Sequence, residues 1–263
     1  MLTIEARDPF ALVRLDRPDK RNALSFELLR ELERAAHRLA RDRRLRGVVL
    51  CGAGPAFCAG IDLSSLSAPG RRLAAFWELV RPGPSLFQRA LLAWRRLPVP
   101  VIAAIHGPCF GAGLQLALAA DLRVAAPDAR LSVMEARWGL VPDMGLAVSA
   151  RGLVRADVLR ELTFSARIVE AEEALRLGLV SRLDANPEQA ALVWLESFAQ
   201  RSPDALLAAK RVLDAALEQP PRRALATEKR WQLRLLLGRN QARAVRRERG
   251  DPGQPYAPRQ YRG

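Results

Sequence analysis

The sequence predicts an α/β fold in which short buried strands alternate with helices. The segments "LRGVVLCGAG" and "VPVIAAIHG" are apolar runs that each end at a glycine turn, as buried strands do. The segment "FELLRELERAAHRLARD" has apolar residues at helical spacing and precedes the first of these strands. This strand–helix–strand order is typical of α/β layering.

The first half of the chain supplies most of the predicted strands. Residues 2–5 and 10–15 are predicted strands, and Asn22 and Ser25 in the turn that follows can cap the next helix. Residues 68–97 contain two predicted helical pieces separated by "RPGP". The buried strand "VPVIAAIHG" then leads to the helix of "GAGLQLALAAD", and "DLRVAAP" is predicted as another strand.

The chain changes character after Arg151 and becomes predominantly helical. Residues 156–183, 186–218 and 227–249 are predicted helices, and 250–263 is a tail that orders only if it docks on something. We therefore divide the chain into a core at 1–195 and a helical C-terminal region at 196–263.

The composition is that of a globular protein with a core of Ala, Leu and Val. Hydrophobic residues make up 49% of the 263 residues and aromatic residues 6%. The longest uncharged run, 97–120, contains three prolines and three glycines, which predicts a buried strand–turn–helix and no membrane span. The N-terminus has no secretory signal pattern, so we expect a cytoplasmic protein.

Cysteine and histidine usage limits the chemistry. Cys51, Cys58 and Cys109 have no metal-type spacing and are expected to be reduced thiols. With only two histidines the sequence excludes a His-rich metal site, and we expect no metal ligands.

The charge balance is strongly basic, with a net charge of +14 and a pI near 11.2. Such a charge can indicate a polyanionic partner. However, only three of the 42 basic residues are lysines, and the arginines are scattered along the chain. We therefore expect no specific nucleic-acid partner.

Two glycine turns that follow apolar strands are the first candidate site. They are "FCAGIDL" at 57–63 and "HGPCFGAGLQL" at 106–116. Small residues let backbone N–H groups approach a ligand, and the second turn also opens a helix, whose N-terminus favours an oxyanion. Either turn can instead serve tight packing alone.

Four ordered motifs resemble the crotonase superfamily, the enoyl-CoA hydratase/isomerase family. They are "VRLDRPDKRNALS", "FCAGIDL", "GAGLQLALAAD" and "SVMEARWGLVPDMG". The resemblance implies a crotonase-like spiral of ββα units followed by a helical trimerisation region, in a homotrimer or hexamer. It also implies an acyl-CoA thioester as substrate and no separate cofactor.

The resemblance also implies roles for individual residues. The backbone N–H groups of Ile61 and Ala112 would form an oxyanion hole for the thioester oxygen. The aromatic side chains of residues 64–97 are candidates for the acyl-pocket wall: Phe76, Trp77, Phe87 and Trp94. The candidate CoA-binding residues are Arg17, Lys20 and Arg21, which could contact phosphates, and Ala23, Ala59, Gly60, Asp62 and Gly111.

The catalytic residues that the resemblance implies are Glu135, Asp143 and Gln115. Members that hydrate enoyl-CoA use two glutamates, and this chain has Gln115 in place of the first and Glu135 in place of the second. Asp143 stands where the dienoyl-CoA isomerases of the family have an aspartate. A glutamine cannot exchange protons near neutral pH, so Gln115 either orients water or the thioester, or clamps the two turns structurally.

These residues favour double-bond isomerisation, with proton transfer by Glu135. Hydration of a 2-enoyl-CoA, with water held by Gln115, is the alternative. A third possibility is a catalytically inactive relative that binds acyl-CoA or RNA.

Overall fold

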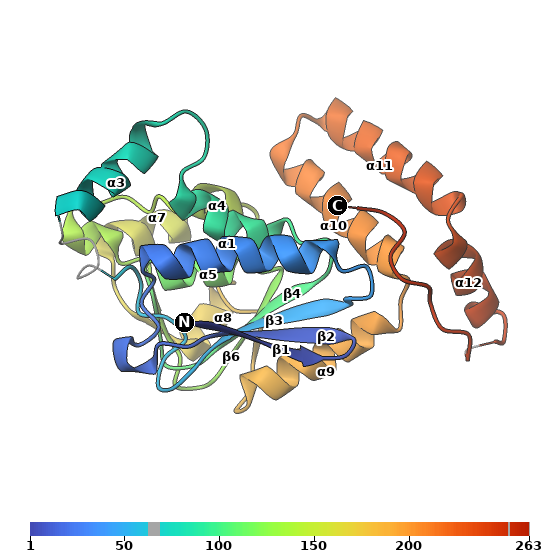
Figure 1. Ribbon diagram of the computed structural model, residues 1–263, viewed down its shortest axis with the longest axis horizontal. Helices are drawn as coiled ribbons and strands as arrows, with labels where there is room; N and C mark the ends of the chain where they lie inside the picture. The colour runs from blue at the N-terminus through green and yellow to red at the C-terminus, as the bar shows by residue number, and fades with distance from the viewer. Residues whose placement is uncertain (63–68, 252, 263) are drawn as a thin grey trace.

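The computed structural model describes residues 1–62, 69–251 and 253–262. A central sheet lies between two sets of helices, and three C-terminal helices extend to one side (Figure 1). The larger sheet has the order β1-β2-β3-β4-β6-β9, in which β1 is antiparallel to β2 and all later neighbours are parallel. Its strands are β1 (Leu2–Arg7), β2 (Phe10–Leu15), β3 (Gly47–Gly52), β4 (Val101–Ile105), β6 (Leu122–Ala125) and β9 (Arg182–Leu183).

A second, three-stranded sheet has the order β5-β7-β8, with β5 parallel to β7. Each strand of this sheet is only two or three residues long: β5 (Pro108–Phe110), β7 (Arg130–Ser132) and β8 (Val169–Glu170). The chain alternates between the two sheets, since β4 is followed by β5 and a helix, and β6 is followed by β7 and a short helix. This repetition of ββα units is the predicted crotonase-like spiral.

Four helices begin at a side-chain cap, which is Ser25, Ser85, Asn186 or Ser202. The Ser25 hydroxyl accepts a hydrogen bond from Leu28 N at 3.2 Å, so Ser25 caps the first helix as predicted. Asn22 is not a cap: its buried side chain accepts from Arg17 N within the preceding turn and donates to Ala53 O and Ala56 O after β3. The helices up to the sheet's last strand are α1 (Phe26–Arg41), α3 (Pro69–Val80), α4 (Leu86–Arg95), α5 (Ala112–Ala119), α6 (Leu146–Ser149), α7 (Ala156–Ser165) and α8 (Ala171–Arg176), with 3₁₀ helices η1 (Pro18–Lys20) and η2 (Glu135–Trp138).

The sheet buries both faces, as the apolar runs of its strands predict. Alternate strand residues such as Leu12, Val49 and Ile102 pack against the next helix, α9 (Pro187–Ala199). The opposite residues, such as Val13 and Leu50, join the main core with α1, α4 and α5. Beyond α9 the chain forms α10 (Pro203–Glu218), α11 (Pro221–Leu236) and α12 (Arg239–Glu248).

Several parts of the predicted element pattern were wrong. Residues 156–183 contain the short strands β8 and β9 as well as helices, and the strands β5 and β7 were not predicted. The predicted helical stretch 186–218 breaks at 200–202, and the last predicted helix breaks at Gly238. Strands of two or three residues have no measurable alternation, and only pairing with distant segments defines them. The predicted domain boundary after 195 falls inside α9, and the division itself stays a prediction.

The C-terminal tail docks on its own chain. The Arg259 side chain is buried, and Nη2 donates to Ala40 O and Asp42 O at the end of α1. Gln260 N donates to Asp204 Oδ1, which ties the tail to α10. The tail, which was predicted to order only if it docks, therefore docks on helices of the same chain.

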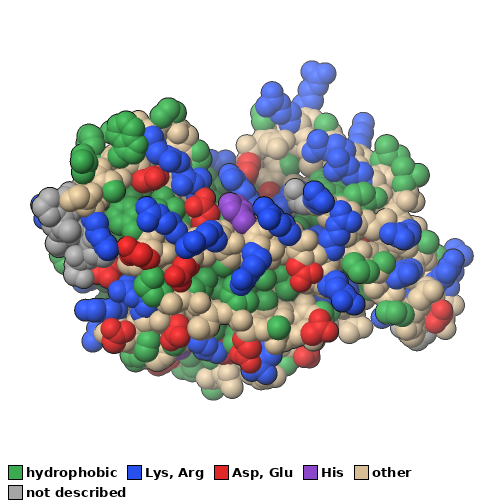
Figure 2. All heavy atoms as spheres, in the orientation of Figure 1, with side chains coloured by type: hydrophobic (Ala, Val, Ile, Leu, Met, Phe, Trp, Pro, Cys, Tyr) green, Lys and Arg blue, Asp and Glu red, His purple; other side chains and the backbone are tan. Residues whose placement is uncertain are grey.

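Basic and acidic side chains are mixed on the surface. Figure 2 shows Lys and Arg spread over the visible face with Asp and Glu among them.

All three cysteines are free and buried. Within the described ranges, no helix is both long and apolar enough to cross a bilayer.

Candidate active site

The two glycine turns lie side by side, because Cys58 and Cys109 pair in an isolated parallel bridge. Cys58 N donates to Pro108 O at 3.1 Å, and Phe110 N donates to Cys58 O at 3.0 Å. Burial raises the pKa of the Cys58 thiol to about 12, so this sulfur is no nucleophile at neutral pH. The cysteines are therefore packing residues beneath the turns.

Glycine is required where the turns meet. Gly60 has φ +109°, and a Cβ there would lie 3.1 Å from Phe110 O and 3.9 Å from Ala112 N. A Cβ on Gly113 would lie only 2.4 Å from Cys58 O. The backbones of the two turns can therefore lie this close together only because Gly60 and Gly113 have no side chains.

Ile61 and Ala112, the residues of the two predicted backbone donors, line one cavity. The bridge between Leu24 and Ile61 uses Gly60 O and Asp62 N and leaves Ile61 N unbonded. Ala112 N belongs to the first turn of α5, where N–H groups have no partner within the helix. Among the hydrogen bonds of the described residues neither N–H has an acceptor, and both residues line the cavity. Two such donors can bind one carbonyl oxygen.

The cavity has a volume of about 510 Å³ and is mostly apolar. The turns, α3, α4, η2 and the loop after η2 contribute its walls. The lining residues are Ala59, Gly60, Ile61, Ala75, Leu79, Phe87, Gly111, Ala112, Met134, Glu135, Trp138, Leu140, Val141, Asp143 and Met144.

Glu135 opens η2 just after β7 and is placed beside the second turn. A Cβ on Gly111 would lie 3.3 Å from Glu135 Oε1, which shows how near the carboxylate lies to the second glycine turn. Oε1 accepts a hydrogen bond from Gln115 Nε2 at 2.7 Å, whereas the buried Oε2 has no partner within the described chain. Burial, with the nearby charge of Asp143, raises the pKa of Glu135 above its usual 4.5. Such a carboxyl group can exchange a proton with a bound ligand.

Gln115 has a structural position in α5, where both polar atoms of its amide have partners. Its Oε1 accepts hydrogen bonds from Met144 N at 2.9 Å and Leu146 N at 3.3 Å, while Nε2 donates to Glu135. The residue is 1% exposed and does not line the cavity. The geometry therefore supports a structural clamp, but one that ties α5 to η2 and to the start of α6 and not, as predicted, the two glycine turns to each other.

Asp143 lies on the same cavity as Glu135, in the loop that leads to the Gln115 contact. Asp143 is exposed to solvent, but partial loss of hydration raises the pKa of its carboxyl group above the usual 3.8. The structure thus brings both predicted carboxylates to one cavity. Their catalytic roles stay predictions.

The predicted CoA-binding residues fall into two groups. Arg17 donates to Ala23 O and pairs with Asp62 Oδ2 at 3.0 Å, so its guanidinium holds the turn together. Lys20 and Arg21 are exposed at the turn of η1, where a phosphate can reach them. The contacts of all these residues with CoA stay predictions, and among the remaining candidates Ala59, Gly60 and Gly111 line the cavity.

The predicted aromatic wall was mostly wrong. Phe87 lines the cavity, but Trp94 is fully buried in the core, and Phe76 and Trp77 are exposed and absent from the lining. Residues 64–68 of the predicted wall lie outside the described residues. The wall is completed instead by residues that were not predicted, in the segment "RWGLVPDM". The sequence signal that could have identified them is a run of apolar residues directly after Glu135, in a segment whose Gly139 and Pro142 predict a loop.

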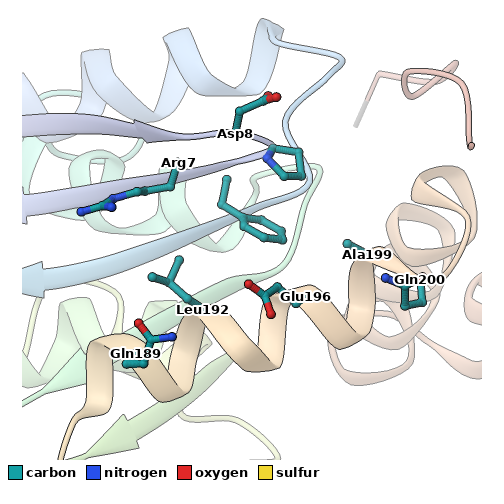
Figure 3. A pocket seen from close by; sticks show the side chains of 9 residues that line it. Arg7, Asp8, Gln189, Leu192, Glu196, Ala199 and Gln200 are labelled. Atoms are coloured by element: carbon teal, nitrogen blue, oxygen red, sulfur yellow. The ribbon is translucent and has the colours of Figure 1, made fainter.

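A hollow of about 610 Å³ lies between the β1–β2 turn and α9 (Figure 3). Its walls include Arg7, Asp8, Gln189 and Glu196, and Arg7 pairs with Glu5 at 2.7 Å. The described residues contain no group of three or more His, Cys, Asp or Glu that could hold a metal ion.

The spiral of ββα units, with two adjacent glycine turns that present N–H groups to an apolar cavity, defines a crotonase-fold protein. Residues 5–246 match the family described as enoyl-CoA hydratase/isomerase. The chain belongs to this family.

Relatives within the family have different names. The Mycobacterium bovis protein named probable enoyl-CoA hydratase echA6 is 38% identical over 221 residues, which cover 83% of this chain and 85% of that protein. The human mitochondrial Delta(3,5)-Delta(2,4)-dienoyl-CoA isomerase is 37% identical over 207 residues, which cover 75% of this chain and 63% of the isomerase. The crystal structure of an enoyl-CoA hydratase from Bacillus anthracis superposes with a TM-score of 0.89 at 25% identity, covering 97% of this chain and 98% of that chain.

Proposed function

We propose that the protein is a double-bond isomerase acting on an unsaturated acyl-CoA. The observation that carries this proposal is the hydrogen bonding of the Gln115 amide, whose Nε2 donates to Glu135 and whose Oε1 accepts from Met144 N and Leu146 N. The position opposite Glu135 therefore has no second proton-exchanging group of the kind that water addition uses. The proton-exchanging side chains among the described lining residues are Glu135 and Asp143.

In the proposed reaction the thioester oxygen accepts hydrogen bonds from Ile61 N and Ala112 N. Glu135 removes a proton from the carbon next to the thioester carbonyl, and the electron pair forms an enolate whose negative oxygen these donors stabilise. The electron pair then shifts along the conjugated chain, and Glu135 returns its proton to a more distant carbon. Substrate and product have the same atoms, so no water or cofactor is consumed.

Asp143 is the second proton-transfer group of the proposal. It lines the same cavity, and its raised pKa favours a protonated fraction that could supply the more distant carbon. In that case the proton taken by Glu135 returns to Asp143 before the next turnover. The name of the human relative supports this proposal, since that protein is called a dienoyl-CoA isomerase.

Hydration of a 2-enoyl-CoA is the second candidate, and the names of the other relatives favour it. It would require Glu135 alone to activate water. An inactive acyl-CoA-binding relative is the third candidate, and the unpartnered Oε2 of Glu135 argues against it.

The Glu135→Gln variant tests the assignment of the base. The substrates are 2-enoyl-, 3-enoyl- and 3,5-dienoyl-CoA, and binding of the CoA thioester is measured beside turnover. We expect binding to persist and turnover to fall by about 10²–10⁴-fold, as removal of a general acid–base group does. Glu196→Gln, in the distant hollow of Figure 3, is the matched control and should keep full activity. Full turnover by Glu135→Gln would contradict the proposal.

A further inference from the structure

Helix α3 has an apolar stripe on its outer side. Large apolar residues at positions i, i+3, i+4 and i+7 are more than half exposed: Leu73 at 69%, Phe76 at 60%, Trp77 at 66% and Val80 at 53%. A stripe with this spacing normally faces a protein core. On α3 it faces outward, because Ala75 and Leu79 on the other side of the helix line the cavity. Figure 2 shows hydrophobic side chains gathered over α3.

Further exposed aromatic side chains surround the mouth of the cavity. Of the phenylalanines and tryptophans in the described part of the chain, four are more than half exposed: Phe76 and Trp77 on α3, Trp138 on η2 and Phe164 on α7. Trp138 lines the cavity together with Leu79 of α3. The end of α7 lies beside η2, because Arg137 of η2 donates to Ala166 O just after α7. Exposed apolar side chains that gather in one region mark a contact with a protein or a membrane.

Arginines flank these apolar side chains. Arg71 and Arg72 lie near the start of α3, and Arg81 directly follows its last residue. Arg160 lies one turn before Phe164 on α7. Arg72 and Arg160 are exposed and have no ion pair or hydrogen bond among the described residues. The acidic side chains of α3 and α7 are each paired with an arginine, so the unpaired charges beside the apolar side chains are positive.

We propose that this surface, made of the outer stripe of α3 with Trp138 and Phe164, binds the surface of an anionic lipid bilayer. With 12 residues, α3 is too short to span a bilayer and would lie in the headgroup region, with its stripe toward the acyl chains and its arginines toward the phosphates. Tryptophan and phenylalanine beside basic residues favour this boundary between lipid and water. The contact goes beyond the proposed function and would bring the mouth of the cavity to the membrane.

The shape and charge of this surface favour a bilayer over a second copy of the chain. Helix α3 projects from the body of the molecule (Figure 1), and such a ridge can enter a bilayer but offers no groove to a protein partner. Two stripes packed antiparallel would place Arg72 of one copy beside Arg81 of the other, where like charges repel. The exposed leucines of the C-terminal helices α10 and α11, which suit self-association, lie at the opposite end of the molecule.

Flotation with lipid vesicles tests the inference. The probes are vesicles of phosphatidylcholine alone and vesicles of phosphatidylcholine and phosphatidylglycerol at about two to one. We expect the protein to bind the anionic vesicles about tenfold more tightly than the neutral ones, and added salt to weaken this binding without abolishing it. No binding to the anionic vesicles, or equal binding to both kinds, would overturn the inference.

Matched variants locate the contact. Trp77→Ser should weaken binding to the anionic vesicles by about tenfold, whereas Val193→Ser, at a 50% exposed position on α9, should not change it. Arg72→Gln should weaken it by about fivefold, whereas Arg239→Gln at an exposed position on α12 should leave it unchanged. Equal losses in these variants and their controls would show binding by the overall charge and contradict the inference.

Tryptophan emission separates insertion from attraction by charge alone. Trp77 and Trp138 are the two tryptophans that are more than half exposed among the described residues, so the emission should shift to shorter wavelength on the anionic vesicles. Trp77→Phe should keep the binding and reduce the shift, and binding without any shift in the parent would contradict insertion. The inference is also wrong if Trp77→Ser lowers the oligomeric mass without changing vesicle binding, because α3 would then be a contact between copies.

Discussion

Glu135 is the residue on which the proposed proton transfer depends, and its raised pKa gives a pH prediction. Only the carboxylate form can accept a proton, so kcat/KM for isomerisation should rise with pH through a midpoint above 4.5. The negative charge of Asp143 contributes to the raised pKa, so Asp143→Asn should move this midpoint to lower pH. Initial rates over a pH series measure both, and a midpoint at or below the usual value would contradict the assignment.

Gln115→Glu tests the clamp. The Nε2 atom lies 2.7 Å from Glu135 Oε1, so a carboxylate oxygen there must share a proton with Glu135, as paired carboxylates do. The shared proton raises the folded-state pKa of the pair above the unfolded value. The variant should therefore match the parent in stability at low pH and become less stable as pH rises through the carboxyl range.

The readouts for Gln115→Glu are thermal unfolding at low and neutral pH and the rate of 2-enoyl-CoA hydration. Because Gln115 does not line the cavity, we expect no large gain in hydration. Gln232→Glu on the exposed side of α11 is the control and should unfold like the parent at both pH values. A large gain in hydration would show that position 115 reaches the water site.

At the scale of elements, a buried ion pair joins α10 to the sheet. Lys210 Nζ lies 2.7 Å from Asp121 Oδ2 and donates to Val99 O, and its side chain is only 9% exposed. Lys210→Met leaves Asp121 without this partner, but the Asp121 side chain is 29% exposed and still accepts from Val101 N, so the cost should be about 1–3 kcal/mol of unfolding free energy. Lys229→Met at an exposed position of α11 should change stability by less than about 0.5 kcal/mol. Denaturant unfolding measures both, and equal effects would contradict a coupling role for Lys210.

The elements that the sequence predicts are those with local signals. The helix after Ser25 and the helical pieces on either side of "RPGP" are confirmed, because caps, glycine turns and apolar periodicity mark their ends. Strands β7 and β8 were missed because pairing with distant segments alone defines them.

The site residues show the same contrast between positions marked by a local sequence motif and positions that only the folded chain brings together. Ile61 and Ala112 were singled out because two motifs that are local in sequence resemble those of the family, and the structure places both residues on the cavity. The lining residues Trp138, Leu140 and Val141 were missed. Their apolar character beside Glu135 was a signal in the sequence, but an irregular loop has no period that tells which side chains face inward.

At the scale of the whole molecule, the C-terminal helices expose an apolar surface suited to self-association. Five leucines there are more than half exposed: Leu213 at 65%, Leu225 at 56%, Leu233 at 61%, Leu236 at 57% and Leu237 at 80%. Patches of this kind mark interfaces. We predict a trimer or a hexamer in solution, measured by light scattering, and a loss of mass in Leu233→Asp/Leu237→Asp.

Val193→Asp, at a 50% exposed position on α9, is the control for this prediction and should keep the mass of the parent. A parent protein of monomer mass would contradict the trimerisation role of the C-terminal region.

The most direct test of the central claim is the mass of the product formed from a 3,5-dienoyl-CoA or 3-enoyl-CoA in water enriched in heavy oxygen. Isomerisation moves a proton between carbons, so the account predicts a product with the mass of its substrate and a double bond at a new position. It also predicts that Glu135→Gln forms this product at least a hundredfold more slowly. A product heavier by one labelled water would show hydration and contradict the account.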